Sequence, residues 1–144
     1  MRENLHLIKG DAGAMDVDAL MLVQTLDLVI GTPVASKLIG RAGEEVQNEC
    51  IRIGTVPAGD AVVTSGGDLG AKSIIHCACL PVGGGSASEE HLVLAIRHGL
   101  LKAREEAVSS IVVPEFPMEG IVFPKKRVAE LVLSEVFRHL DDKD

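Results

Sequence analysis

The clearest pattern in the chain is an apolar run, a loop and an amphipathic segment between residues 18 and 50. Residues 19–23 are apolar at every position, which is typical of a strand buried on both faces. Beyond Gly31, Thr32 and Pro33, apolar residues recur at every fourth position and therefore share one helical face. These residues are Val34, Leu38, Ala42, Val46 and Cys50. The order predicts a crossover unit of an α/β sheet, with the loop at the strand's carboxyl end, where such folds bind ligands.

Shorter runs along the rest of the chain predict four more strands, at residues 5–8, 61–64, 72–77 and 110–113. A helix is expected to begin at Ser86 or Ser88, since both are good N-cap residues and Ser86 with Glu89 fits a capping box. Its predicted buried stripe is Leu92, Ile96, Leu100, Ala103 and Ala107.

A last helix is predicted to open at Pro124, with an inner face made of Val128, Val132, Val136 and Leu140. Strands thus alternate with helices, and one pair of strands is joined directly. This order predicts a three-layer α/β/α sandwich with a mixed, mostly parallel sheet. A chain of 144 residues is the size of one domain, so we expect a single domain over residues 1–144.

Composition and charge narrow the classes of protein. The hydrophobic content is 47%, and the sequence contains no apolar run long enough to span a bilayer and no signal peptide. The formal net charge of −7 argues against general nucleic-acid binding, because phosphate contacts need clustered Lys and Arg. We therefore expect a soluble, cytoplasmic protein with no membrane partner.

The three cysteines do not make an even disulfide framework. His76, Cys77 and Cys79 suggest a metal site at first sight, but in a strand the two cysteines point to one face and His76 to the other. We interpret Cys77 and Cys79 as small core residues. No metal site and no cofactor is expected.

Several longer stretches resemble a macro domain: AGEEVQNEC at residues 42–50, GDAVVT at residues 59–64 and AKSIIH at residues 71–76. The resemblance covers nearly the whole chain, in order. It implies the macro-domain fold and binding of ADP-ribose or a related metabolite. Some members of the family also hydrolyse ADP-ribosyl esters or phosphates, so the resemblance allows a hydrolase as well.

The resemblance also implies roles for individual residues. Asp11 matches the aspartate that accepts a hydrogen bond from the adenine amino group. The alternative, based on turn propensity alone, is that Asp11 is a turn residue or a helix cap. Thr25 stands where the family has the asparagine that holds the distal ribose. The full set of implied ligand-binding positions is Asp11, Ala12, Thr25, Gly31, Thr32, Val34, Pro117, Met118, Glu119, Gly120 and Ile121.

The chain departs from the family where the ligand's phosphates and distal ribose would lie. Leu22 and Thr25 replace the two asparagines of the family's VNAAN stretch. Pro33 and Pro117 have no N–H for a pyrophosphate, and Glu119 adds a negative charge. The loss of two hydrogen bonds and the presence of one nearby carboxylate weaken the binding free energy of ADP-ribose by roughly 5 kcal/mol or more. A loss of this size turns a micromolar dissociation constant into a millimolar one.

Three functions follow as hypotheses. The first is a divergent macro domain that binds ADP-ribose, or a related adenine nucleotide or nucleoside, weakly and without efficient catalysis. The second is a hydrolase of ADP-ribosyl or O-acetyl-ADP-ribose groups, for which Thr25 and Glu119 are weak catalytic candidates. The third is a structural module with an inactive pocket. The chain ends before the strand and helix that follow in the family, so we also expect a homo-oligomer that covers the sheet edge.

Overall fold

The computed structural model describes residues 6, 9–29, 32–83, 87–114 and 125–141. Within them, four strands form one sheet in the order β2–β3–β1–β4. Their bounds are Ala19–Thr25 for β1, Ala61–Ser65 for β2, Ser73–Leu80 for β3 and Ile111–Val112 for β4. β1 runs parallel to β3 and β4, whereas β2 runs antiparallel to β3. The predicted mixed, mostly parallel sheet is therefore confirmed.

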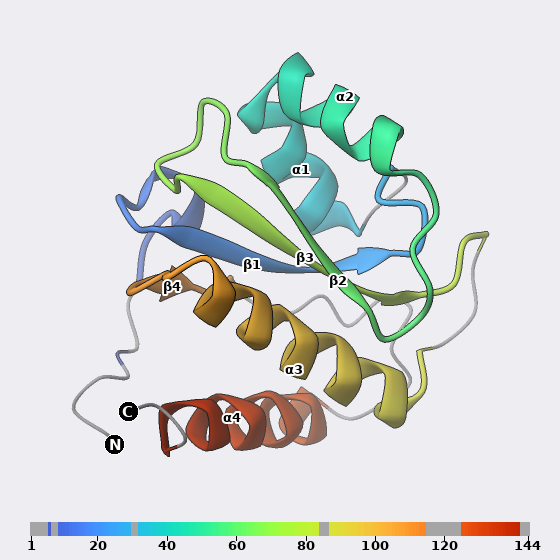
Figure 1. The fold of residues 1–144 in the computed structure, drawn as a ribbon, viewed down its shortest axis with the longest axis vertical. Helices are drawn as coiled ribbons and strands as arrows, with labels where there is room; N and C mark the ends of the chain where they lie inside the picture. The colour runs from blue at the N-terminus through green and yellow to red at the C-terminus, as the bar shows by residue number, and fades with distance from the viewer. Residues whose placement is uncertain (1–5, 7–8, 30–31, 84–86, 115–124, 142–144) are drawn as a thin grey trace.

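Helices cover both faces of this sheet (Figure 1). α1 (Pro33–Ala42) and α2 (Glu44–Ile53) lie on one face, and α3 (Glu89–Glu105) lies on the other with α4 (Lys125–Asp141) alongside it. A short 3₁₀ helix, η1 (Ala12–Ala14), precedes β1. The three-layer sandwich expected from the alternation of strands and helices is thus confirmed. None of the helices in the described part of the chain is both long and apolar enough to cross a bilayer.

The predicted helix over residues 34–50 is two helices, and this corrects the sequence interpretation. Gly43 lies between them at φ +109°, a backbone conformation that favours glycine. The predicted face is nevertheless the inner one, because Leu38, Ala42, Val46 and Cys50 are all buried. The four-residue periodicity therefore predicted correctly which side of the segment is buried, but it did not predict the break at Gly43.

The bounds of α3 and β4 differ in part from those predicted. α3 begins after Ser88, whose Oγ accepts a hydrogen bond from the His91 N–H at 3.0 Å. Ala107 is not part of the buried stripe, because α3 ends at Glu105 and Ala107 is exposed at φ +56°. β4 is two residues long, shorter than the predicted strand at residues 110–113. Ser86, Pro124 and the predicted strand at residues 5–8 (apart from His6) lie outside the described residues.

The core is divided by the sheet into two layers. Cys77 and Cys79 point toward α3 and are buried as free thiols, which confirms their interpretation as core residues. Burial raises the pKa of both thiols, that of Cys79 to about 12. The opposite layer contains Leu22 of β1 packed with Leu38 of α1.

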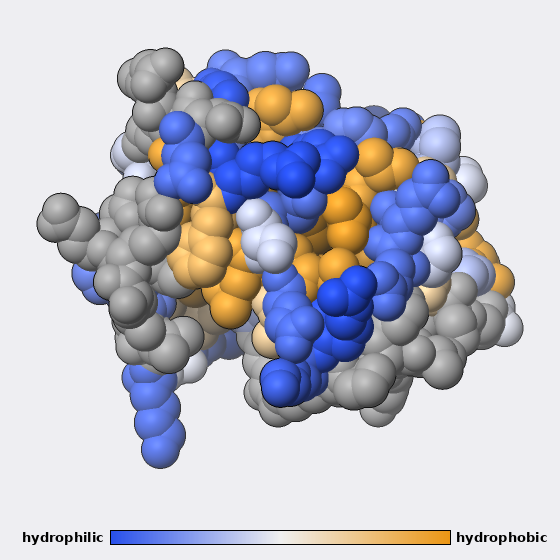
Figure 2. Space-filling model, turned by 90° about the horizontal axis from the view of Figure 1, so that it is seen from below, coloured by the Kyte–Doolittle hydropathy of each residue, from blue (hydrophilic) through white to orange (hydrophobic). Residues whose placement is uncertain are grey.

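The outer surface around α4 is mixed in character. Figure 2, seen from that side, shows apolar patches separated by bands of polar residues. Leu101 of α3 and Leu133 of α4 are among the exposed apolar residues. Ion pairs tie the two helices together: Arg97 binds both carboxylate oxygens of Glu135, at 3.1 and 2.9 Å.

Candidate functional site

The carboxyl end of β1 leads directly into the loop where the predicted ligand site begins. Thr25 is the last residue of β1 and is buried. Its Oγ1 donates a hydrogen bond to Asp27 Oδ1 at 2.7 Å, and the Val29 N–H donates to the same oxygen at 3.1 Å. The hydroxyl proton of Thr25 is therefore used inside its own loop.

The N-terminus of α1 is the part of the predicted phosphate site that the structure describes. Thr32 caps the helix: its Oγ1 accepts from the Ala35 N–H at 3.0 Å and its carbonyl accepts from the Ser36 N–H at 2.8 Å. Pro33 is the first helical residue and has no N–H. Among the described first-turn amides, that of Val34 is left to face an anion. One amide is a weak anion site beside the several that a glycine-rich loop presents.

Asp11 lies before η1, and its carboxylate is engaged three times. Oδ1 accepts from the Gly13 N–H at 3.0 Å and from Arg41 Nη1 at 2.9 Å, and Oδ2 accepts from Arg41 Nη2 at 2.8 Å. The hydrogen bond from Arg41 is the main cause of the lowered pKa of Asp11, so the carboxylate stays ionised at neutral pH. The expected capping role is confirmed; recognition of adenine stays a prediction.

These residues lie at the two ends of α1. Thr25, Thr32 and Val34 are at its N-terminal end, whereas Asp11 is attached to its last turn through Arg41. Arg41 lies nine positions beyond Thr32, which is about 13 Å along the helix axis. Ala12 begins η1 beside Asp11. The other predicted site residues lie outside the described part of the chain: Gly31, Pro117, Met118, Glu119, Gly120 and Ile121.

The sequence analysis missed a chain of buried polar side chains behind the site. Gln24 Nε2 lies 3.0 Å from His76 Nδ1, and His76 Nε2 lies 2.9 Å from Thr64 Oγ1. Both Gln24 and His76 are fully buried, and burial lowers the pKa of His76 to about 4. The available signal was a glutamine at the end of an apolar strand. Its partner lies 52 residues away, so local pattern could not find it.

Comparison with known proteins supports the resemblance. Residues 24–132 match the family model described as Macro domain. The chain is 34% identical over 145 residues to a macro domain-containing protein of Listeria monocytogenes, covering 96% of this chain and 82% of that protein. It is 31% identical over 140 residues to a macro domain-containing protein of Cupriavidus necator, covering 93% and 80%.

Other relatives differ in length or have a named activity. A protein of Thermotoga maritima is 34% identical, and the chain spans 98% of its own length but 24% of that protein. The O-acetyl-ADP-ribose deacetylase of Shigella dysenteriae is 26% identical, with 94% of this chain and 80% of that protein covered.

Solved structures share the fold. The macrodomain of Oceanobacillus iheyensis with ADP aligns with a TM-score of 0.79 at 22% identity, covering 94% of this chain and 75% of that one. The Trypanosoma brucei macrodomain in complex with ADP-ribose aligns with a TM-score of 0.77 at 20% identity, covering 89% and 53%. At these identities the likeness establishes the architecture.

Proposed function

The chain belongs to the macro domain family, and from that premise we propose that it binds ADP-ribose or a related adenine nucleotide or nucleoside, weakly and without efficient catalysis. Two of the structures with this fold contain ADP or ADP-ribose, which supports the ligand class. The observation that carries the proposal is the state of two side chains, Asp11 and Thr25.

Asp11 supports binding at the adenine end. An ionised carboxylate offers about four lone-pair sites, and three of them accept from Gly13 and Arg41. The remaining site is on Oδ2, and the side chain is 54% exposed. An amino group can therefore still donate to it, whereas a carbonyl at the same edge would be repelled. This chemistry selects adenine over bases that present an oxygen there.

Thr25 supports the loss of catalysis at the ribose end. Its hydroxyl donates to Asp27, so it does not present that donor to the distal ribose, and it lacks the paired donor and acceptor of an asparagine amide. Pro33 removes one amide from the start of α1. Contacts to the phosphates and the distal ribose are weaker in consequence, and the adenosine end carries most of the affinity.

Calorimetric titration with ADP-ribose and with adenosine tests this proposal. We expect both to bind in the millimolar range, with adenosine at least equal to ADP-ribose. Asp11→Ala should weaken both by about tenfold or more, the loss of a hydrogen bond to a charged group. Asp16→Ala, an exposed aspartate of the same segment, is the matched control and should change neither. Micromolar binding of ADP-ribose would overturn the proposal.

One comparison favours a second function, hydrolysis of O-acetyl-ADP-ribose, because the Shigella dysenteriae relative is named for that activity. The assay is release of acetate from O-acetyl-ADP-ribose by the whole chain, followed by the same assay on Glu119→Gln. We expect no turnover above background. Turnover that the Glu119→Gln change abolishes would establish the hydrolase instead, with Glu119 as its base.

A further inference from the structure

We propose that the pocket between α1 and α2 is a second binding site, separate from the ADP-ribose cleft, for a small neutral single-ring molecule that carries one N–H or O–H donor. The juxtaposition behind this proposal is a largely apolar surface pocket, a buried carbonyl oxygen of Gln24 without a partner, and a helical glycine at the pocket's edge that leaves space beside it. The proposal does not depend on the proposed function.

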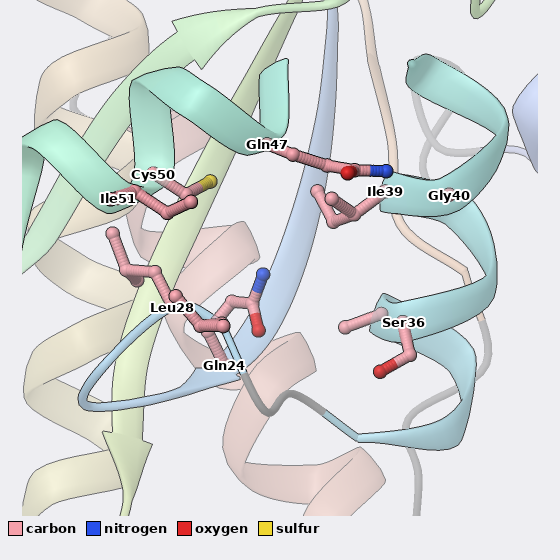
Figure 3. Close-up of a pocket in the computed structure, with 10 residues that line it drawn as sticks. Gln24, Leu28, Ser36, Ile39, Gly40, Gln47, Cys50 and Ile51 are labelled. Carbon is pink, nitrogen blue, oxygen red and sulfur yellow. The ribbon is translucent and has the colours of Figure 1, made fainter. Parts of the chain in front are cut away.

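The pocket lies over the end of β1, between the facing sides of α1 and α2 (Figure 3). Its volume is about 200 Å³. An apolar protein cavity of about 150 Å³ is known to bind benzene, so this one has room for a single ring with a substituent. Of the predicted ADP-ribose contacts that the structure describes, none lines it: these are Asp11, Ala12, Thr25, Thr32 and Val34. The lining residues are Gln24, Leu28, Val29, Ala35, Ser36, Ile39, Gly40, Gln47, Cys50 and Ile51.

The walls determine the charge and polarity of the occupant. Leu28, Ile39, Cys50 and Ile51 supply apolar surface from the loop and from both helices. None of the described lining residues carries a charge, so an anion entering the pocket would lose its hydration without gaining a cationic partner. Phosphates and carboxylates are therefore excluded, and a neutral ring is favoured.

The backbone at Leu28 shows that the loop is shaped to present this wall. Leu28 has φ +61°, a left-handed conformation that a bulky side chain rarely adopts. A turn holds it there, because the Leu28 N–H donates to the Thr25 carbonyl at 3.0 Å. Its side chain is 98% buried beside the pocket. Strained residues of this kind persist where the surroundings fix them, and they gather at ligand sites.

The floor of the pocket provides one buried polar side chain, Gln24, whereas Ser36 and Gln47 line the pocket from exposed positions. The orientation of the Gln24 amide follows from its neighbours. Thr64 Oγ1 donates to the Ser65 carbonyl at 3.1 Å, so toward His76 Nε2 it accepts. His76 therefore carries its proton on Nε2, and Nδ1 is an acceptor. Gln24 must then direct Nε2 toward Nδ1, which leaves Oε1 as the outer atom of the amide.

Gln24 Oε1 is buried and has no hydrogen-bond partner in the described structure. The Gln24 amide points into the space between Ser36 and Ile39 of α1 and Cys50 of α2 (Figure 3). A buried acceptor without a donor is unfavourable, and its terminal torsion is soft, so the oxygen can adjust toward a donor that enters. A ligand with one N–H or O–H group completes this network.

Gly40 lies at the exposed edge of the pocket, where the protein places no side chain. It occupies an interior position of α1 and lines the pocket. A Cβ built on it meets no atom within 4 Å. Packing against a neighbour therefore does not require glycine here, although glycine is a poor residue for a helix interior. The missing side chain keeps the pocket open.

The experiment is a titration of the whole chain with phenol and with anisole, followed by backbone and side-chain amide NMR shifts. The two probes share a ring, but only phenol has a donor. We expect phenol to shift the Gln24 side-chain amide and residues of α1 and α2, and to bind about fivefold more tightly than anisole. Equal binding of the two, or no binding of phenol, would overturn the proposal.

A pair of variants locates the site. Gly40→Leu adds a side chain into open space and should weaken phenol binding at least tenfold. Lys37→Leu adds the same side chain to an exposed position of α1 that does not line the pocket, and should leave phenol binding unchanged. Unchanged binding in Gly40→Leu would place phenol elsewhere. Adenosine should shift residues near Asp11 instead, so the two sites can fail independently.

Discussion

Glycine occurs once within α1 and once within α3, and the two positions differ in burial: Gly99 is buried against the sheet, whereas Gly40 is exposed at the edge of the pocket. A Cβ on Gly99 of α3 would lie 2.7 Å from Cys77 Sγ and 3.2 Å from Met21 Sδ, whereas one on Gly40 of α1 meets nothing within 4 Å. α3 is docked so closely that its backbone lies against the strands. At Gly40, the space lies on the exposed side of α1, beside the pocket.

Polar groups are divided in the same way. The core beneath α3 is built from apolar side chains and thiols, including Met21, Cys77 and Leu92. The other face contains Gln24, His76 and Thr64, all buried. Close apolar packing contributes stability, while buried polar groups beside a space provide specific contacts for a ligand. On the α1–α2 face, the buried polar side chains and the proposed pocket occur together, beside an apolar core of that face's own.

The largest expected effect comes from shortening the same side chain on each face. Leu92→Ala should lower the free energy of unfolding by about 3 kcal/mol, because Leu92 is fully buried in the close-packed layer. Leu28→Ala, equally buried but beside the pocket, should cost about 1–2 kcal/mol less, since the new space adjoins one that already exists. Urea unfolding measures both. Equal losses would contradict the difference in packing.

Whereas the Leu92→Ala change removes atoms, adding a methyl group at Gly99 tests how closely α3 packs against the sheet. Gly99→Ala places a Cβ within van der Waals overlap of Cys77 Sγ, so the helix or the strand must move. We expect a loss of about 2 kcal/mol in the free energy of unfolding, although alanine is the better helix former. The double change Gly99→Ala with Cys77→Ala should recover part of the loss. A stabilised Gly99→Ala variant would show that α3 is not closely docked.

Most helices and strands can be predicted from the local sequence pattern, but a break within a helix cannot. The apolar run at residues 19–23 identified β1, and Ser88 identified the start of α3. The break at Gly43 was missed because α1 and α2 continue the same four-residue spacing on their buried sides. Periodicity records which side is buried, not whether the backbone is continuous. The single residue that could mark the break was the glycine.

The candidate site was only partly accessible to sequence reasoning. Thr25 and Asp11 were predicted because they occupy positions that match macro-domain motifs. The use of the Thr25 hydroxyl by Asp27 and the Arg41 ion pair with Asp11 depend on three-dimensional placement. His76 meets Gln24 through the pairing of β1 with β3. Contacts across 30 or 52 residues leave no local signal.

The buried network of Gln24, His76 and Thr64 should make the free energy of unfolding depend on pH. This dependence should occur at a higher pH than the one at which the carboxylates titrate. The folded-state pKa of His76 is about 4, below the unfolded value of 6.5, so the unfolded chain binds more protons between these values. Its stabilising effect is complete above pH 6.5 and is lost as pH falls toward 4. From pH 7.5 to 5 the free energy of unfolding should fall by about 2 kcal/mol.

His76→Gln is the control for this dependence, because an amide can hydrogen-bond to Gln24 and Thr64 without titrating. Urea unfolding of this variant should vary less between pH 7.5 and 5 than that of the parent. The carboxyls with lowered pKa, those of Asp11, Asp18, Glu49 and Glu89, lose their contribution only at lower pH. The same steep fall in His76→Gln would place the titrating group elsewhere.

The smallest expected effect is the only predicted increase in the free energy of unfolding. Gly40→Ala should raise the free energy of unfolding by about 0.5–1 kcal/mol, because alanine restricts the unfolded chain, suits a helix interior and finds open space for its methyl group. Thermal unfolding of Gly40→Ala and Gly99→Ala side by side gives the sign of each change. Opposite signs for one chemical change show that packing, not helix propensity, separates the two faces. A destabilised Gly40→Ala would mean that α1 and α2 close over the pocket in solution.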